Sequence, residues 1–150
     1  MWAACVLFPL SPALAASDEG DTAAAQALIR EGTGYLEAGN IERAARQFER
    51  AVQLAPADPI GYIHLARARG AAKRYAEAHK VLAKADIHAQ GDKKALYEIL
   101  LVRGDLHRDE GNVDLARTAY ERAAGTRFFH REATARLQAL DAPPPPPAED

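Results

Sequence analysis

The sequence is poor in cysteine, in net charge and in aromatic residues, and each shortage excludes a class of protein. Its one cysteine, Cys5, rules out an internal disulfide framework and a zinc site built from several cysteines. With 19 basic and 21 acidic residues the formal net charge is -2, so no basic field indicates binding to nucleic acid. Aromatic residues make up 7% of the chain, whereas alanine fills 34 of its 150 positions. Because alanine is the strongest helix former and fills little volume, the composition predicts closely packed helices.

The amino-terminal segment has the pattern of an export signal. Residues 1–17 carry no charged side chain and contain a short apolar run that ends in several small residues. Small residues at the −3 and −1 positions fit a signal peptidase, so we expect 1–16 to be a signal peptide cleaved after Ala15 or Ala16. Residues 17–21 would then be a linker, and the mature chain would be periplasmic or secreted. The run is too short, and too interrupted by proline, to span a membrane.

An alternative keeps the protein anchored to the cell envelope. Cys5 follows two alanines, as in the lipid-attachment motif of bacterial lipoproteins, but too few apolar residues precede it. We expect contact with a membrane only if Cys5 is lipidated or the amino-terminal segment stays uncleaved. If the signal is removed, the mature chain has no cysteine, which suits an oxidising compartment.

The carboxy-terminal segment, 142–150, contains five consecutive prolines. Such a run forms neither helix nor sheet and adopts an extended polyproline II conformation. We therefore expect a disordered tail or spacer here, in preference to a ligand for an aromatic groove.

Between the two ends the sequence repeats itself. The best-preserved positions recur after 34 residues and again after 38, in three sets: Ala44, Phe48 and Ala51, then Ala78, Leu82 and Ala85, then Ala116, Tyr120 and Ala123. Each copy contains two stretches with the 3.6-residue periodicity of an amphipathic helix. No single copy buries its apolar face alone, so stacked copies are expected to share one continuous core.

This pattern resembles the tetratricopeptide repeat. The first copy carries the family's signature residues, which are Leu28, Gly32, Tyr35, Ala44, Phe48, Ala51 and Pro56. The later copies depart from it at Arg69, Arg103 and His107, where large apolar side chains usually stand. The resemblance implies an all-α fold at 22–141, a right-handed α-solenoid of three helix-turn-helix repeats with a carboxy-terminal capping helix. The expected boundaries are 25–58, 59–92 and 97–130 for the repeats and 127–140 for the capping helix.

Local signals place seven helices between about residues 22 and 140. The Gly-Asn pairs at 39–40 and 111–112 predict turns in which glycine ends one helix and asparagine caps the next. Asp58, which is followed by proline, is expected to cap the first helix of the second repeat. Asp92 is expected to cap the first helix of the third, which the four extra residues lengthen by about one turn.

The sequence shows no motif of catalysis or metal binding. No two of the five histidines, at 64, 79, 88, 107 and 130, are three or four residues apart, and no cysteine or set of carboxylates stands beside them. No phosphate-binding glycine loop or nucleophile elbow is present. We therefore expect no catalytic, cofactor-binding or metal site and no enzymatic activity.

The resemblance implies that the working surface is a concave groove lined by the first helices of successive repeats. In the family this groove holds an extended peptide or a partner helix. The residues that follow the signature positions by one place form a second row along the first helices. This row consists of Ile29, Thr33, Leu36, Ile63, Arg67, Leu101, Asp105 and Arg108. This row mixes apolar and charged side chains, which is typical of a partner surface. The terminal helix or a second copy of the chain is the alternative occupant.

Some members of the family bind acidic carboxy-termini through a clamp of lysine and asparagine side chains. The corresponding positions here hold Ile29, Thr33, His64 and Arg67, of which only Arg67 is suitable. We therefore expect a different protein or peptide partner. The sequence predicts a non-catalytic adaptor or assembly factor of a bacterial cell envelope, or alternatively a structural homo-oligomer.

Overall fold

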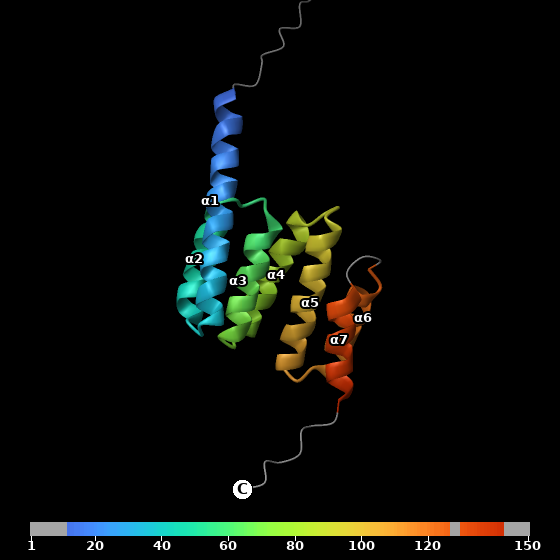
Figure 1. Cartoon of the computed structure of the whole chain (residues 1–150). Coiled ribbons are helices and arrows are strands. Elements are labelled where there is room, and N and C mark those ends of the chain that lie inside the picture. The colour runs from blue at the N-terminus through green and yellow to red at the C-terminus, as the bar shows by residue number, and fades with distance from the viewer. Residues whose placement is uncertain (1–11, 127–129, 143–150) are drawn as a thin grey trace, which may run out of the picture.

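The computed structural model describes residues 12–126 and 130–142, with side chains from residue 19 onwards. This part of the chain forms seven α-helices and no strand: α1 Pro12–Glu37, α2 Ile41–Leu54, α3 Pro59–Ala71, α4 Tyr75–His88, α5 Lys93–Asp109, α6 Val113–Ala124 and α7 His130–Asp141. Figure 1 shows α1, α3, α5 and α7 in one layer, with α2, α4 and α6 behind them. The expected all-α solenoid of three helical pairs and a terminal helix is confirmed.

In the first and third repeats, a glycine on the first helix meets an aromatic ring on the second. A Cβ atom added to Gly32 would lie 2.6 Å from the Phe48 ring, and one added to Gly104 would lie 2.3 Å from the Tyr120 ring. Both rings are fully buried. The close approach of the two backbones therefore depends on the absence of a side chain at these glycines.

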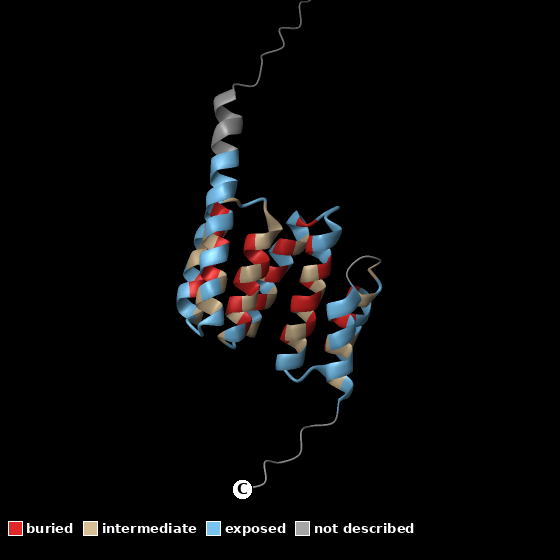
Figure 2. Cartoon of the chain, viewed as in Figure 1, coloured by how far each residue is buried: buried red, intermediate tan, exposed pale blue. Residues whose placement is uncertain are grey.

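The repeats stack so that their apolar faces join. Between the second and third repeats, Ile63, Leu82 and Val102 lie in one buried cluster. Full burial of a side chain of this size stabilises the fold by about 1.5–3 kcal/mol. Figure 2 shows the buried residues on the helix faces that are turned toward one another. At the end of the array α7 buries Ala133 and packs Leu137 against the last cluster, so it is the capping helix that the sequence predicted; residues 127–129 of the prediction lie outside the described residues.

The helix caps agree with the sequence in two cases and differ in two. The Asp58 side chain accepts a hydrogen bond from the Ile60 N–H, and Asp92 accepts from two N–H groups of the first turn of α5. The prediction that Asn40 and Asn112 act as side-chain caps was wrong, because neither makes a capping hydrogen bond. Their ψ angles, 63° and 68°, lie away from the extended value of the capping residues, 117° at Asp58.

The turns inside the three repeats share one backbone conformation. In the first, Gly39 has φ +76°, and the next N–H donates to a carbonyl five residues back in α1, as in a Schellman motif. Gly111 has φ +82° in the third repeat. The equivalent residue of the second repeat is Lys73, with φ +59°, although side chains disfavour this left-handed region.

The amino-terminal boundary differs from the expectation. α1 starts at Pro12, so residues 17–21, which we expected to be a linker, are helical. Alanines precede this segment at 15–16 and follow it at 23–25, and their helix propensity continues the helix although residues 19–24 are exposed. Figure 1 shows the first turns of α1 extending past the other helices.

Two other expectations fall mainly outside the described residues. The predicted signal peptide lies largely in residues 1–11, and the proline-rich tail lies in 143–150. Among the helices that the structure describes, none combines the length and the apolar character that crossing a membrane requires.

Candidate functional site: the concave face

The residues predicted to line the groove divide into a buried and an accessible group. Ile63 and Leu101 are 0% and 1% exposed and Ile29 is 9% exposed, so these three side chains offer a partner very little surface, although Leu101 lines the hollow described below. A first helix inside the array contacts its own second helix and also the neighbouring first helices. More of its circumference is therefore buried than the apolar face that periodicity within one repeat predicts. Thr33 and Leu36 are half-buried; the Thr33 hydroxyl donates to a carbonyl of α1, and Leu36 packs against the core of the first repeat.

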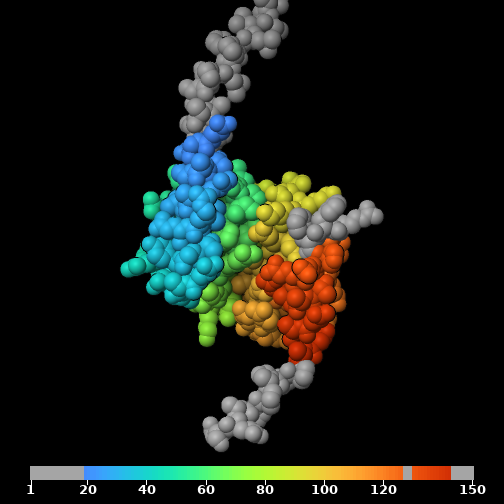
Figure 3. Space-filling view, in the orientation of Figure 1, coloured from blue at the N-terminus to red at the C-terminus, as the bar shows by residue number. Residues whose placement is uncertain are grey.

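Arg67, Asp105 and Arg108, with Leu101, are the predicted residues that line two adjoining hollows. The larger lies between α3, α5 and α7, and the smaller lies between α3 and α5. The larger hollow has a volume of about 440 Å³ and is lined by His64, Arg67, Lys94, Tyr97, Glu98, Leu101 and Glu132. The smaller, of about 200 Å³, is lined by Arg67, Gly70, Ala71, Val102, Asp105, Leu106, Arg108 and Asp109. In Figure 3 the surface between α3 and α7 is recessed, and α7 stands in front of it.

Several lining residues of the larger hollow were not predicted. Lys94, Tyr97 and Glu98 precede Leu101 by seven, four and three residues, so they lie on the same face of α5, one to two turns earlier. Extending the predicted row backwards at helical spacing would have found them. Glu132 on α7 required the position of the terminal helix.

Arg67 is the residue common to both hollows, and its charge is only loosely paired. The shortest distance from its guanidinium to the Glu98 carboxylate is 3.9 Å, and the two side chains are 35% and 21% exposed. An ion pair this long and this exposed contributes little to stability. The guanidinium is therefore positioned to exchange Glu98 for the carboxylate or carbonyl of another molecule.

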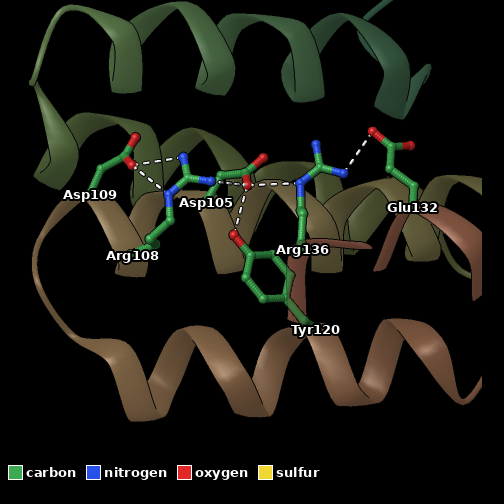
Figure 4. A network of polar contacts seen from close by, with 6 residues as sticks. All are labelled: Asp105, Arg108, Asp109, Tyr120, Glu132 and Arg136. Carbon is green, nitrogen blue, oxygen red and sulfur yellow. Dashed lines mark hydrogen bonds and ion pairs between the residues drawn. The ribbon is translucent and has the colours of Figure 1, made fainter. Parts of the chain in front are cut away.

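Asp105, by contrast, is the centre of a tight polar network (Figure 4). Its Oδ1 atom accepts hydrogen bonds from the Tyr120 hydroxyl at 2.7 Å, from Arg136 Nε at 2.9 Å and from an Arg108 amino group at 3.3 Å. Burial, with the bond to Asp105, raises the pKa of Tyr120 well above its usual value, so the hydroxyl stays a donor. The network ties α5, α6 and α7 together at one end of the concave face.

His64 contributes no positive charge to the larger hollow at neutral pH. Burial, together with the nearby Arg67 charge, lowers the pKa of His64 to about 4. Its ring lies against Phe48, with 5.3 Å between the ring centres. The cationic groups of this hollow are therefore Arg67 and Lys94.

This low pKa predicts a specific dependence of stability on pH. Above pH 6.5 His64 is neutral in both states, and between pH 6.5 and 4 only the unfolded chain takes up the proton. Acidification should therefore lower the unfolding free energy through this residue by about 3 kcal/mol, a loss that is complete below about pH 4. His64→Phe keeps the ring contact and removes the titration. The difference in unfolding free energy between wild type and His64→Phe should change by that amount between pH 7 and 4, and a pH-independent difference would contradict the assignment.

A second polar cluster lies away from this face, between α4 and the end of α5. Glu110 Oε2 is 3.0 Å from His79 Nε2 and 3.3 Å from His107 Nδ1. Hydrogen bonds from His79 and then from His107 lower the pKa of the Glu110 carboxyl. The spacing of histidines within one helix did not predict this grouping, because the two histidines come from different repeats.

The stacked helical pairs with a recessed inner face define the class of the protein, an α-helical repeat array. Two family models described as tetratricopeptide repeat match residues 35–100 and 97–127 and together span more than half of the chain. The chain belongs to the tetratricopeptide repeat family. A search of curated proteins finds no match.

Solved structures agree with this assignment. The N-terminal domain of stress-induced protein-1 (STI-1) from C. elegans is 21% identical, with a TM-score of 0.61, and the match covers 81% of this chain and 98% of that one. The second domain of human RPAP3, in complex with an HSP70 peptide, is 17% identical with a TM-score of 0.64, covering 84% and 99%. The Yersinia enterocolitica type III secretion translocator chaperone SycD is 14% identical with a TM-score of 0.65, covering 77% and 87%. At these identities the similarity shows the fold.

Proposed function

We propose that this protein is a non-catalytic adaptor or assembly factor of a bacterial cell envelope that binds a peptide or helix of a partner protein on its concave face. The observation that carries the proposal is the position of Arg67 between the two hollows, with its guanidinium 3.9 Å from Glu98. The human RPAP3 domain, whose solved structure includes an HSP70 peptide, has the same architecture. The export signal expected at residues 1–16 supports the envelope location.

The chemistry of the hollows indicates the kind of partner segment that fits. Arg67 and Lys94 offer cationic donors, while Tyr97 and the barely exposed Leu101 supply an apolar floor. Glu98 and Glu132 line the same hollow, and their negative charges would repel a partner segment with several consecutive acidic residues. A segment with one acidic or carbonyl-rich position beside an apolar residue is therefore the best match.

The test is charge reversal on the concave face after the partner has been captured from an envelope extract and identified by mass spectrometry. Arg67→Glu should weaken binding of the purified partner by tenfold or more, about 1.4 kcal/mol, with helicity and melting temperature unchanged within error. The control is Arg46→Glu, which reverses an exposed charge on α2 and should leave the affinity unchanged. Isothermal titration calorimetry measures both.

Other outcomes would favour other surfaces. If Arg46→Glu abolished binding and Arg67→Glu did not, the outer face would be the binding surface. If neither mattered while Leu137→Ala reduced binding, α7 would carry the contact. A molar mass that doubles with concentration in light scattering, and that Arg67→Glu returns to the monomer, would show that a second copy fills the groove.

A further inference from the structure

We propose that His79, His107 and Glu110 form a binding site for Zn²⁺ that joins the second and third repeats. His79 lies on α4, His107 lies in the last turn of α5, and Glu110 follows α5 directly. One nitrogen or oxygen atom from each residue lies within 4.8 Å of the other two. All three side chains are between 20% and 31% exposed, so an ion can reach them from solvent.

The donor set suits zinc. Two imidazole nitrogens and one carboxylate oxygen are ordinary zinc ligands, whereas calcium and magnesium prefer oxygen donors alone. Zinc–ligand bonds of about 2.0–2.2 Å in a tetrahedron place neighbouring donor atoms roughly 3.3 Å apart. The two separations from Glu110 Oε2, 3.0 Å to His79 and 3.3 Å to His107, already match that value.

Little rearrangement is needed to complete the site. The two imidazole rings lie side by side, with 4.9 Å between their centres and 34° between their planes, and both turn a nitrogen toward the same carboxylate oxygen. The nitrogen atoms have to approach each other only by side-chain rotation, since the backbone already places the residues together. Three protein ligands leave a fourth position for water, as expected of an exposed site.

The position of the cluster gives the ion a structural role. α4 contacts α5 less extensively than α2 contacts α3, the equivalent junction between the first two repeats. The extra residues that break the 34-residue spacing lie in α5 itself, which has 17 residues where α3 has 13. An ion bound to α4 on one side and to α5 on the other would therefore stabilise the weaker junction and the concave face that spans it.

The competing interpretation is a hydrogen-bonded cluster in which Glu110 accepts from both histidines and no metal binds. Titration of zinc chloride into the untagged full chain, followed by calorimetry, distinguishes the two. We expect one Zn²⁺ per chain, with affinity reduced at least tenfold by His79→Gln and by Glu110→Gln. Glu110→Gln keeps the size of the side chain and a hydrogen-bond acceptor, so it removes the charged ligand without removing the contact. The matched control is His130→Gln, an exposed histidine at the start of α7, which should bind Zn²⁺ as the wild type does.

Thermal unfolding gives the second measurement. Zinc should raise the melting temperature of the wild type and of His130→Gln by several degrees, with little effect on Glu110→Gln, and a chelator should reverse the rise. The proposal is wrong if the triple variant His79→Gln, His107→Gln and Glu110→Gln retains the wild-type affinity, or if no one-to-one binding is detected. Loss of binding in His130→Gln, or one ion shared by two chains, would equally overturn it.

Discussion

Gly104→Ala should lower the unfolding free energy by about 2 kcal/mol, whereas the same substitution at Gly34 should raise it by up to about 1 kcal/mol. Both glycines lie inside helices, where alanine is favoured over glycine by about 1 kcal/mol. At Gly34 no atom beyond the helix lies within 4 Å of the new Cβ, so only this gain is expected. At Gly104 the Cβ would lie 2.3 Å from the Tyr120 ring, and overpacking of this kind costs about 3 kcal/mol.

Burial and a hydrogen bond both restrain the ring of Tyr120. It is fully buried, and its hydroxyl is held by Asp105 at 2.7 Å. The clash must therefore separate α5 from α6. Urea unfolding of the two variants under identical conditions measures the difference, and two effects of the same sign would show that α5 and α6 are not in the close contact described above.

Asp105→Ala should cost about 2–3 kcal/mol of unfolding free energy. The substitution removes the shared acceptor of one tyrosine and two arginines, and bonds to charged groups each contribute about 1.5–3 kcal/mol. We take a value well below their sum because the Asp105 side chain is 26% exposed and water replaces part of what is lost.

Two further variants separate charge from hydrogen bonding at this site. Asp105→Asn keeps an oxygen that accepts from the Tyr120 hydroxyl, so its cost should be nearer to 1 kcal/mol. Asp109→Ala removes an exposed carboxylate that also pairs with Arg108 and should change stability by less than about 0.5 kcal/mol. Equal losses for Asp105→Ala and Asp109→Ala, measured by urea unfolding, would show that the Asp105 network carries no special weight.

The sequence predicted most of the fold because the same pattern of packing residues occurs three times along the chain. Phe48, Leu82 and Tyr120 recur at equivalent positions, so spacing and periodicity predicted the repeated helices, and the resemblance to the tetratricopeptide repeat implied how they pair. The start of α1 was not predictable in this way. Residues 19–24, the first whose side chains the structure describes, are all exposed, and they carry no hydrophobic pattern to mark the boundary.

The concave face was predicted less completely because its width depends on contacts between repeats. Ile63 and Leu101 were placed one position outside the packing stripe, and the neighbouring first helices bury them. Arg67, Asp105 and Arg108 remained accessible on the hollows, since charged side chains stay where water reaches them. The grouping of His79 with Glu110 required the relative placement of α4 and α5, which periodicity within one repeat does not contain.

Lys73 shows that this sequence is not optimised for maximal stability. Of the three equivalent left-handed turns, two have the glycine that this conformation favours, and the second repeat keeps a lysine at φ +59°. For a residue with a side chain, this left-handed conformation costs about 1 kcal/mol of folding free energy relative to glycine. Natural proteins are held only above the stability that their function requires, so such unoptimised positions persist. Replacement of Lys73 by glycine in the turn of the second repeat would therefore be a way for the array to regain stability lost to mutations elsewhere.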